Sequence, residues 1–147
     1  MDIRFLNIPD VKLIRPKRFG DEREYFSETW SDGLFREVIA NVSPVQDNQA
    51  ASAWKGTPRG LHLQKPPFAQ RKLARVVRGS ILDVVVDIRN GSPSYRQDVA
   101  VRLHAVEGAQ LWVSPGFRPA FVRSKTKPRS STKSLPITAP SYFEFKG

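Results

Sequence analysis

The sequence predicts an all-β domain, an antiparallel sandwich or barrel with one short helix. Short segments in which apolar and polar residues alternate recur along the first four fifths of the chain, and several are rich in β-branched residues. Turn signals containing Gly, Pro, Asn and Asp separate these segments. One stretch alone has its apolar residues at helical spacing. Many short strands divided by turns are typical of β-sandwiches and barrels.

The N-terminal part predicts short strands. Pro9-Asp10 interrupts a loose alternation of apolar residues, which indicates a strand, a turn and a second strand. Residues 25–30 then alternate as a strand, with Phe26, Glu28 and Trp30 on one face. A carboxylate between two aromatic side chains is either a ligand contact or a charge at the rim of the sheet.

The predicted helix covers residues 32–40. Its apolar side chains fall at helical spacing, and Asp32 is placed to cap its N-terminus. The next strand is expected over residues 42–48. It ends in three polar residues: Gln46, Asp47 and Asn48.

The stretch from residue 59 to residue 87 contains the side chains best suited to acid–base chemistry and anion binding. Arg59 and His62 lie in a short alternating segment, and Lys72 begins the next strand after a Pro66-Pro67 turn. A β-branched strand follows. Neighbouring strands of one sheet would bring Arg59, His62 and Lys72 together at one site.

The later strands are expected over residues 98–104 and 111–113. His104, the second of two histidines, is expected to face solvent. Asp83 and Asp87 share one face of their strand, and Asp83 is the better candidate for the partner of a histidine.

Composition limits the classes of function. The 147 residues carry a formal charge of +10, and the last thirty hold seven Lys or Arg and one Glu, so the preceding part carries +4. A mildly basic body suits an anionic ligand. The chain has no cysteine, hence no disulfide, thiolate nucleophile or Cys-ligated zinc. No apolar run approaches the length of a membrane span, and a cytoplasmic location is expected.

The available side chains suit proton abstraction next to a carbonyl. Two histidines are too few for a metal site of the jelly-roll type, and no phosphate-binding Gly-rich loop or Gly-x-Ser-x-Gly motif occurs. In the expected chemistry His62 takes a carbon-bound proton, and Lys72 stabilises the enolate oxygen. An arginine holds a phosphate group through two hydrogen bonds.

Several motifs occur in a fixed order and spacing. They are Gly20-Asp21-x-Arg23, Phe26-x-Glu28, Gln46-Asp47-Asn48, Arg59-Gly60-Leu61-His62-x-Gln64, Lys72-Leu73-x-Arg75, Asp83-Val84-x-Val86-Asp87-x-Arg89, Gln110-Leu111-Trp112 and Pro115-Gly116-Phe117. Together they resemble the dTDP-4-dehydrorhamnose 3,5-epimerase family over residues 1–117.

The resemblance implies a cupin-type antiparallel jelly roll, a homodimer, and catalysis without cofactor or metal. It implies a dTDP-linked 4-keto-6-deoxyhexose substrate, epimerised at C5 and C3 for L-rhamnose biosynthesis. By motif, His62 matches the base and Lys72 the residue that stabilises the enolate. The substrate-binding residues that the resemblance implies are Arg23, Phe26, Glu28, Gln46, Asp47, Asn48 and Arg59.

The sequence departs from the family pattern after Phe117. Pro119 stands where the family has its second histidine, and Ser131-Thr132 where it has a proton-donating tyrosine. The chain also ends ahead of the family's aspartate that orients the base. We therefore expect an epimerase-like domain over residues 1–117 and a basic, divergent tail over residues 118–147. The last strands are expected to be missing or altered and the activity impaired.

Two origins of the tail stay open. A reading-frame shift explains its charge and lost alternation, because a frame moved by one base permits a Glu-Val-Val-Tyr-Lys segment there. Otherwise the tail is a natural, solvated extension; nucleic-acid binding is not expected, since residues 124–139 contain no aromatic side chain for base stacking. Two alternatives to the enzyme are a non-catalytic cupin that binds a nucleotide sugar and a truncated product that folds poorly.

Overall fold

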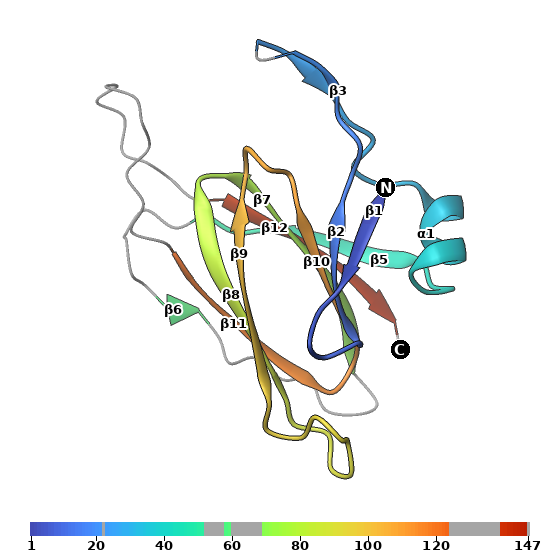
Figure 1. Ribbon diagram of the computed structural model, residues 1–147, viewed down its shortest axis with the longest axis vertical. Helices are drawn as coiled ribbons and strands as arrows, with labels where there is room; N and C mark the ends of the chain where they lie inside the picture. The colour runs from blue at the N-terminus through green and yellow to red at the C-terminus, as the bar shows by residue number, and fades with distance from the viewer. Residues whose placement is uncertain (22, 52–57, 60–68, 124–138, 147) are drawn as a thin grey trace.

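A computed structural model describes residues 1–21, 23–51, 58–59, 69–123 and 139–146 (Figure 1). Side chains are described throughout these ranges except at residues 58, 59 and 123 and in the last range, where Glu144 alone is described. Two antiparallel sheets face each other, and a short helix lies outside the larger one. The predicted all-β fold is confirmed.

The larger sheet has six strands in the order β1-β2-β10-β7-β12-β5. Every neighbouring pair is antiparallel. In sequence order its strands are β1 (Asp2–Phe5), β2 (Val11–Arg15), β5 (Pro44–Gln49), β7 (Gln70–Arg78), β10 (Gln110–Val113) and β12 (Ala139–Lys146).

The smaller sheet has four strands in the order β6-β11-β8-β9, also antiparallel. Its strands are β6 (Pro58–Arg59), β8 (Ser80–Asp87), β9 (Asp98–His104) and β11 (Phe117–Arg123). A separate hairpin of β3 (Phe19–Gly20) and β4 (Tyr25–Phe26) projects from the body, away from both sheets (Figure 1). We call this hairpin, residues 19–26, the arm.

The main core lies between the two sheets. Alternate residues of each strand point inward, so the period of two in the sequence becomes one apolar face per sheet. The larger sheet contributes Val11, Leu13, Ala74, Val76, Leu111 and Val113. The smaller sheet contributes Ile81, Val85, Val99, Leu103 and Phe117.

A second apolar cluster covers the outer face of the larger sheet. Helix α1 (Asp32–Val38) buries Phe35 there, against Leu73 of β7 and Trp112 of β10. The Phe35 ring meets Trp112 edge-on at 5.2 Å between centroids. Both faces of the central strands are therefore buried. No helix in the described ranges is long and apolar enough to span a membrane.

Two local predictions were wrong. Residues 27–30 do not extend β4, because tertiary contacts hold them elsewhere: the carbonyl of Thr29 accepts a hydrogen bond from Gln110 Nε2 at 2.8 Å. Asp32 is the first helical residue and Ser31 is the N-cap, which makes no side-chain capping bond. The Asp32 carboxylate instead accepts a hydrogen bond from Arg36 Nε at 2.8 Å.

The stretch after residue 117 contributes backbone to both sheets. β11 pairs with β8 along its whole length, from Phe117 opposite Asp87 to Arg123 opposite Ile81. β12 lies between β7 and β5 in the larger sheet. The division of the chain at residue 117 stays a prediction.

Candidate functional site

Four residues lie abreast across the larger sheet: Val113 on β10, Lys72 on β7, Glu144 on β12 and Gln46 on β5. We call this set the lysine row. Directly paired residues of antiparallel strands share a face. Because Val113 is buried in the core between the sheets, the lysine row faces that interior.

Within the lysine row, Lys72 and Glu144 form an ion pair of 3.7 Å between Nζ and Oε1. Their side chains are 25% and 14% exposed, so the pair is only partly open to solvent. Lys72 therefore places a positive charge at the edge of an apolar core, with a carboxylate as its neighbour. A charge in such a position acts more strongly than one in water.

A second row crosses the smaller sheet, with Asp83 on β8, Phe121 on β11 and Arg59 on β6 in register. We call it the aspartate row. Phe121 packs against the main core, so this row also faces the interior. Of Arg59 the structure describes the backbone only.

Asp83 is a buried carboxyl group of this interior with few hydrogen-bond partners. It is 2% exposed, and its Oδ1 accepts no hydrogen bond from any described residue. Burial raises the pKa of Asp83 to about 7, although the charge of Lys72 opposes this rise. Lys72 and Asp83 thus face the same interior from opposite sheets, near enough for the charge of Lys72 to lower the pKa of Asp83.

The predicted Gln46-Asp47-Asn48 motif is divided between two faces. Gln46 and Asn48 share a face, and Gln46 Nε2 donates a hydrogen bond to Asn48 Oδ1 at 2.9 Å. Asp47 is in register with Phe143 and, through it, with Leu73, which packs in the outer cluster. The period of two in a strand thus separates Asp47 from the lysine row.

The structure does not bring Arg23, Phe26 and Glu28 to Lys72 within one chain. Arg23 and Phe26 belong to the arm, and Glu28 follows it; all three side chains are exposed. In Figure 1 the arm stands clear of the two sheets.

The structure describes one of the two histidines. His62 lies outside the described residues. His104 lies opposite Ser80 at the end of β9 and is half-buried rather than facing solvent freely. Its Nδ1 accepts a hydrogen bond from the Val106 backbone N–H at 3.1 Å.

At the other end of β8, Asp87 lies in a fully bonded network. Its carboxylate accepts hydrogen bonds from Arg89 Nε and Nη2, the Arg89 backbone N–H, and the Ser92 and Ser94 hydroxyls, at 2.6–3.0 Å. Arg89 also donates to Asp10 at 2.7 Å and stacks on the Phe117 ring. The Arg89 hydrogen bonds, aided by Ser92 and Ser94, hold the pKa of Asp87 well below its usual range.

Sequence reasoning missed Glu144. It was assigned to a divergent tail, and nothing near it in the sequence marks it as a neighbour of Lys72. The contact exists because β12 inserts between β7 and β5, far from both along the chain. The aromatic residues that surround Glu144, from Tyr142 to Phe145, are typical of a strand and could have indicated one here.

Comparison with known proteins gives concordant results. A sequence model of the dTDP-4-dehydrorhamnose 3,5-epimerase family matches residues 5–133. The enzyme of that name from Sinorhizobium fredii is 49% identical over 140 residues, which cover 95% of this chain and 70% of the relative. The one from Shigella flexneri is 45% identical over 122 residues, 82% of this chain and 67% of the relative.

Solved structures agree. The dTDP-4-dehydrorhamnose 3,5-epimerase of Bacillus anthracis, with TDP and pyrophosphate bound, superimposes with a TM-score of 0.86 at 36% identity, covering 99% of this chain and 78% of that one. The Legionella pneumophila 3,5-epimerase in complex with dTDP-4-keto-L-rhamnose gives a TM-score of 0.85 at 33% identity, covering 99% and 72%. The cupin-like architecture, the family model and these relatives establish that this chain belongs to the dTDP-4-dehydrorhamnose 3,5-epimerase family.

Proposed function

We propose that the chain acts on dTDP-4-dehydro-6-deoxy-D-glucose and epimerises it at C5 and C3 to dTDP-4-dehydro-L-rhamnose, a step of L-rhamnose biosynthesis. The observation that carries this proposal is the inward-facing Lys72, which lies beside an apolar core and acts electrostatically on the buried Asp83. The names of the relatives and the dTDP-sugar in the Legionella structure support the substrate.

The reaction needs a base, a cation and a proton donor. In the proposal, His62 removes the proton from the carbon next to the 4-keto group, and the electron pair of the C–H bond moves onto the carbonyl oxygen. The Lys72 ammonium stabilises the negative charge of this enolate oxygen. An acid on the opposite side, a tyrosine in the family pattern, then delivers a proton to the opposite face of the same carbon, which inverts it and restores the ketone. In this chain Ser131-Thr132 stands in place of that tyrosine, so solvent is the proposed proton source.

Binding involves the remaining predicted residues. Gln46 and Asn48 lie on the face of Lys72, and Arg59 lies in the aspartate row, which suits contacts with sugar and phosphate oxygens. If the arm enters the interior of a second chain, Arg23, Phe26 and Glu28 can contact the nucleotide bound there. Asp47 lies on the opposite face of β5, so in this proposal it supports the strand that carries Gln46 and Asn48 rather than touching the ligand.

A homodimer accommodates this arm. Phe19, Tyr25 and Phe26 are 61%, 56% and 71% exposed, and a second chain would bury them. Sedimentation equilibrium tests the assembly: a dimer is expected, and a monomer at all concentrations would contradict it. The proposed location is the cytoplasm, because a charged dTDP-sugar does not cross a bilayer unaided.

A second candidate function is a non-catalytic protein that binds a nucleotide sugar. The ion pair with Glu144 favours it, because a carboxylate 3.7 Å from the Lys72 ammonium offsets the charge that an enolate would need. The expected absence of the family's tyrosine acid points the same way.

Solvent deuterium exchange distinguishes these functions. The keto-sugar is incubated with the chain in D₂O, and deuterium at C3 and C5 and net epimerisation are measured. We expect exchange that exceeds net epimerisation, because the base is present and the tyrosine acid is not. Full epimerisation would contradict the impairment, and stabilisation by dTDP without any exchange would support the binding protein.

Variants assign the exchange to the site. Lys72→Met removes the cation and is expected to lower exchange by about 10²-fold or more. His62→Asn removes the proposed base and is expected to abolish exchange. Lys17→Met, at an exposed lysine, is the matched control and keeps the wild-type rate.

A further inference from the structure

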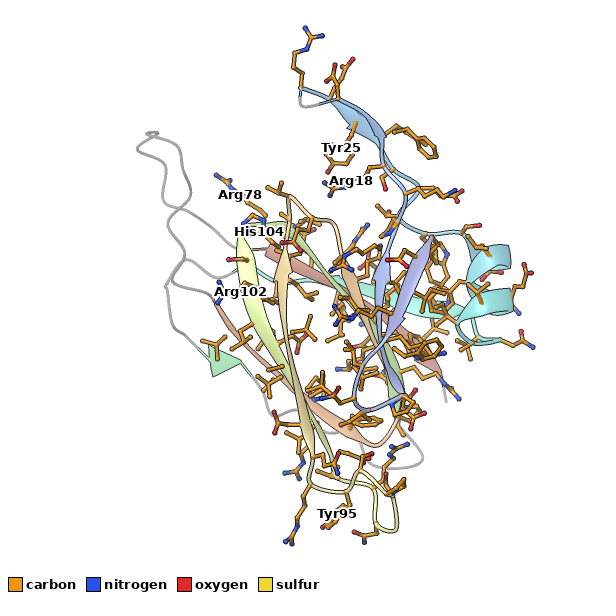
Figure 2. The ribbon with its side chains drawn as sticks, in the orientation of Figure 1. Arg18, Tyr25, Arg78, Tyr95, Arg102 and His104 are labelled. Atoms are coloured by element: carbon orange, nitrogen blue, oxygen red, sulfur yellow. The ribbon has the colours of Figure 1, made fainter. Side chains whose placement is uncertain are left out.

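Arg18, at the base of the arm, reaches the body of the protein. Its guanidinium donates hydrogen bonds to two backbone carbonyls of the turn after β9, from Nη1 to Val106 and from Nη2 to Ala105, the latter at 3.2 Å. The same guanidinium lies over the Tyr25 ring, 4.2 Å from its centroid. Figure 2 shows Arg18 and Tyr25 together where the arm leaves the body. One cation thus contacts both the returning strand of the arm and the body.

The turn that receives Arg18 is itself fixed. The backbone N–H groups of Glu107 and Gly108 donate to the His104 carbonyl at 3.1 and 3.2 Å, and Ala105 N–H donates to the Gly79 carbonyl at 3.0 Å. The two carbonyls that bind Arg18 are therefore presented by a turn that is hydrogen-bonded to the β7–β8 connection. A fixed acceptor pair restricts the guanidinium to one orientation.

Gly108 leaves the space that Arg18 occupies. Its φ of +64° suits glycine, and a Cβ at this position would lie 2.3 Å from Arg18 Nη2. A side chain at Gly108 would thus displace the guanidinium without removing its charge.

Few described contacts tie residues 19–26 themselves to the body of the same chain, although Thr29, three residues beyond the arm, is held there by Gln110 and Arg75. Within the part of the chain that the structure describes, the hydrogen bonds of residues 19–26 stay inside the arm, as between Asp21 and the backbone of Arg23 and Glu24. Its three aromatic side chains are largely exposed. Within one chain, Arg18 therefore gives the arm a side-chain link to the turn after β9.

We propose that Arg18 is a positioning residue that fixes the arm on the body, and so sets the direction from which Arg23 and Phe26 meet a dTDP-linked ligand. The inference rests on the proposed function, in which the arm binds the nucleotide. Arg18 acts through the arm: its guanidinium is engaged by the two carbonyls and by Tyr25.

Binding of dTDP to the full chain tests the ligand part of the inference. Arg18→Ala is expected to weaken dTDP binding by about tenfold or more, measured by calorimetry, with the unliganded melting temperature little changed. Arg18→Lys keeps the charge but cannot donate two hydrogen bonds in the fixed geometry of a guanidinium. Its affinity for dTDP is expected to lie between those of the parent chain and Arg18→Ala. Arg102→Ala, at an exposed arginine of β9, is the control and binds as wild type.

Two glycine variants separate positioning from charge. Gly108→Ala displaces Arg18 and keeps its charge, and it is expected to weaken dTDP binding as Arg18→Ala does. Gly91→Ala carries similar backbone strain, with φ of +81°, but its Cβ would have no neighbour within 4 Å, and unchanged binding is expected. Weakening by Arg18→Ala without weakening by Gly108→Ala would show a direct charge contact with the ligand and overturn the inference.

A distance measurement tests the arm without any ligand. The chain has no cysteine, so spin labels at Glu24→Cys and Arg102→Cys report the distance from arm to body in samples diluted with unlabelled chain. A narrow distribution is expected with Arg18 present and a broad one in Arg18→Ala and Gly108→Ala. An equally narrow distribution in Arg18→Ala would overturn the inference. If the parent chain fails to bind dTDP, the proposed function fails, while the distance distributions still decide on Arg18.

Discussion

Asp83 and Asp87 are four residues apart on β8, point into the same interior and are 2% and 0% exposed, yet their carboxyl groups behave in opposite ways. Burial raises the pKa of Asp83 to about 7. Hydrogen bonds from Arg89 hold the pKa of Asp87 well below the ordinary value of 3.8. Burial alone therefore does not decide the state of a carboxyl group in this core.

The difference arises from where the partners are found. The turn that follows β8 brings Arg89, Ser92 and Ser94 back to Asp87. This short segment supplies the hydrogen bonds that the structure describes for the Asp87 carboxylate. Asp83 lies mid-strand and interacts with Lys72, on the other sheet, which is also paired with Glu144. The C-terminal end of β8 is satisfied by its own turn and stabilises the fold, whereas the middle of the strand keeps a poorly satisfied carboxyl group at the proposed site.

The largest effect is expected from Asp87→Asn. The change leaves the Arg89 guanidinium without its main anionic partner and should lower the free energy of unfolding by about 3–5 kcal/mol. Ser94→Ala removes one hydrogen bond of the same network and should cost about 1 kcal/mol. Urea unfolding at pH 7 measures both. Similar small losses for the two variants would show that the network is not structural.

The pH dependence of Asp87 follows from its lowered pKa. Its contribution to stability is present above the unfolded value of 3.8 and is lost as the pH falls through the folded value. The loss of stability below pH 4 should therefore be smaller in Asp87→Asn than in the parent chain.

Asp83→Asn should act in the opposite direction. Because the pKa of Asp83 is about 7 in the folded chain and near 3.8 when unfolded, the folded state holds more protons between pH 4 and 7. The contribution of Asp83 to stability is thus fully present below pH 4 and is lost as the pH rises to 7, by on the order of 2–4 kcal/mol. Unfolding measured at pH 4.5 and 8 should show this loss in the parent chain and not in Asp83→Asn. Asp98→Asn, at an exposed carboxylate, is the control; parallel pH curves for all three would contradict the account.

Glu144→Gln should have a smaller effect. Without the Glu144 carboxylate, the Lys72 charge acts more fully on Asp83 and lowers its pKa. The loss of stability between pH 4 and 7 should shrink by about 1 kcal/mol or less. The same two-pH unfolding experiment detects it, and a larger pH dependence in Glu144→Gln would show that Glu144 does not compete for Lys72.

The smallest effect is expected at the helix surface. Arg36 and Asp32 of α1 form an ion pair whose side chains are 43% and 51% exposed. Asp32→Asn should change the unfolding free energy by about 0.3–0.5 kcal/mol at pH 7. Thermal melts measure it, and a loss of more than about 1 kcal/mol would mean that exposed pairs matter as much as buried ones.

The sequence predicted what local patterns encode. The β-branched stretch 81–87 and the predicted strands 98–104 and 111–113 correspond to β8, β9 and β10, and the shared face of Asp83 and Asp87 follows from the period of two. The strand at residues 25–30 was wrong because contacts with Gln110 and Arg75 hold Thr29 outside the ladder. Such contacts leave no trace in local sequence.

The site was predicted in part for the same reason. The expectation that Arg59 and Lys72 lie on neighbouring strands of one sheet was wrong, because Arg59 belongs to β6 of the smaller sheet and Lys72 to β7 of the larger one. Asp47 cannot share the face of Gln46, because the two are adjacent in one strand. The insertion of β12 beside β7 set the neighbour of Lys72, and pairing between strands so far apart in the sequence is not encoded locally.

The most direct test of the contrast is a carboxyl titration of the chain labelled with ¹³C-aspartate, free and with the dTDP-linked keto-sugar. In the free chain Asp83 should titrate near pH 7, while Asp87 stays ionised well below pH 3.8. Addition of the keto-sugar should move the Asp83 signal and leave that of Asp87 in place. Ordinary titration of both groups, or an equal response of both to the sugar, would contradict the assignment of Asp83 to the site and of Asp87 to the fold.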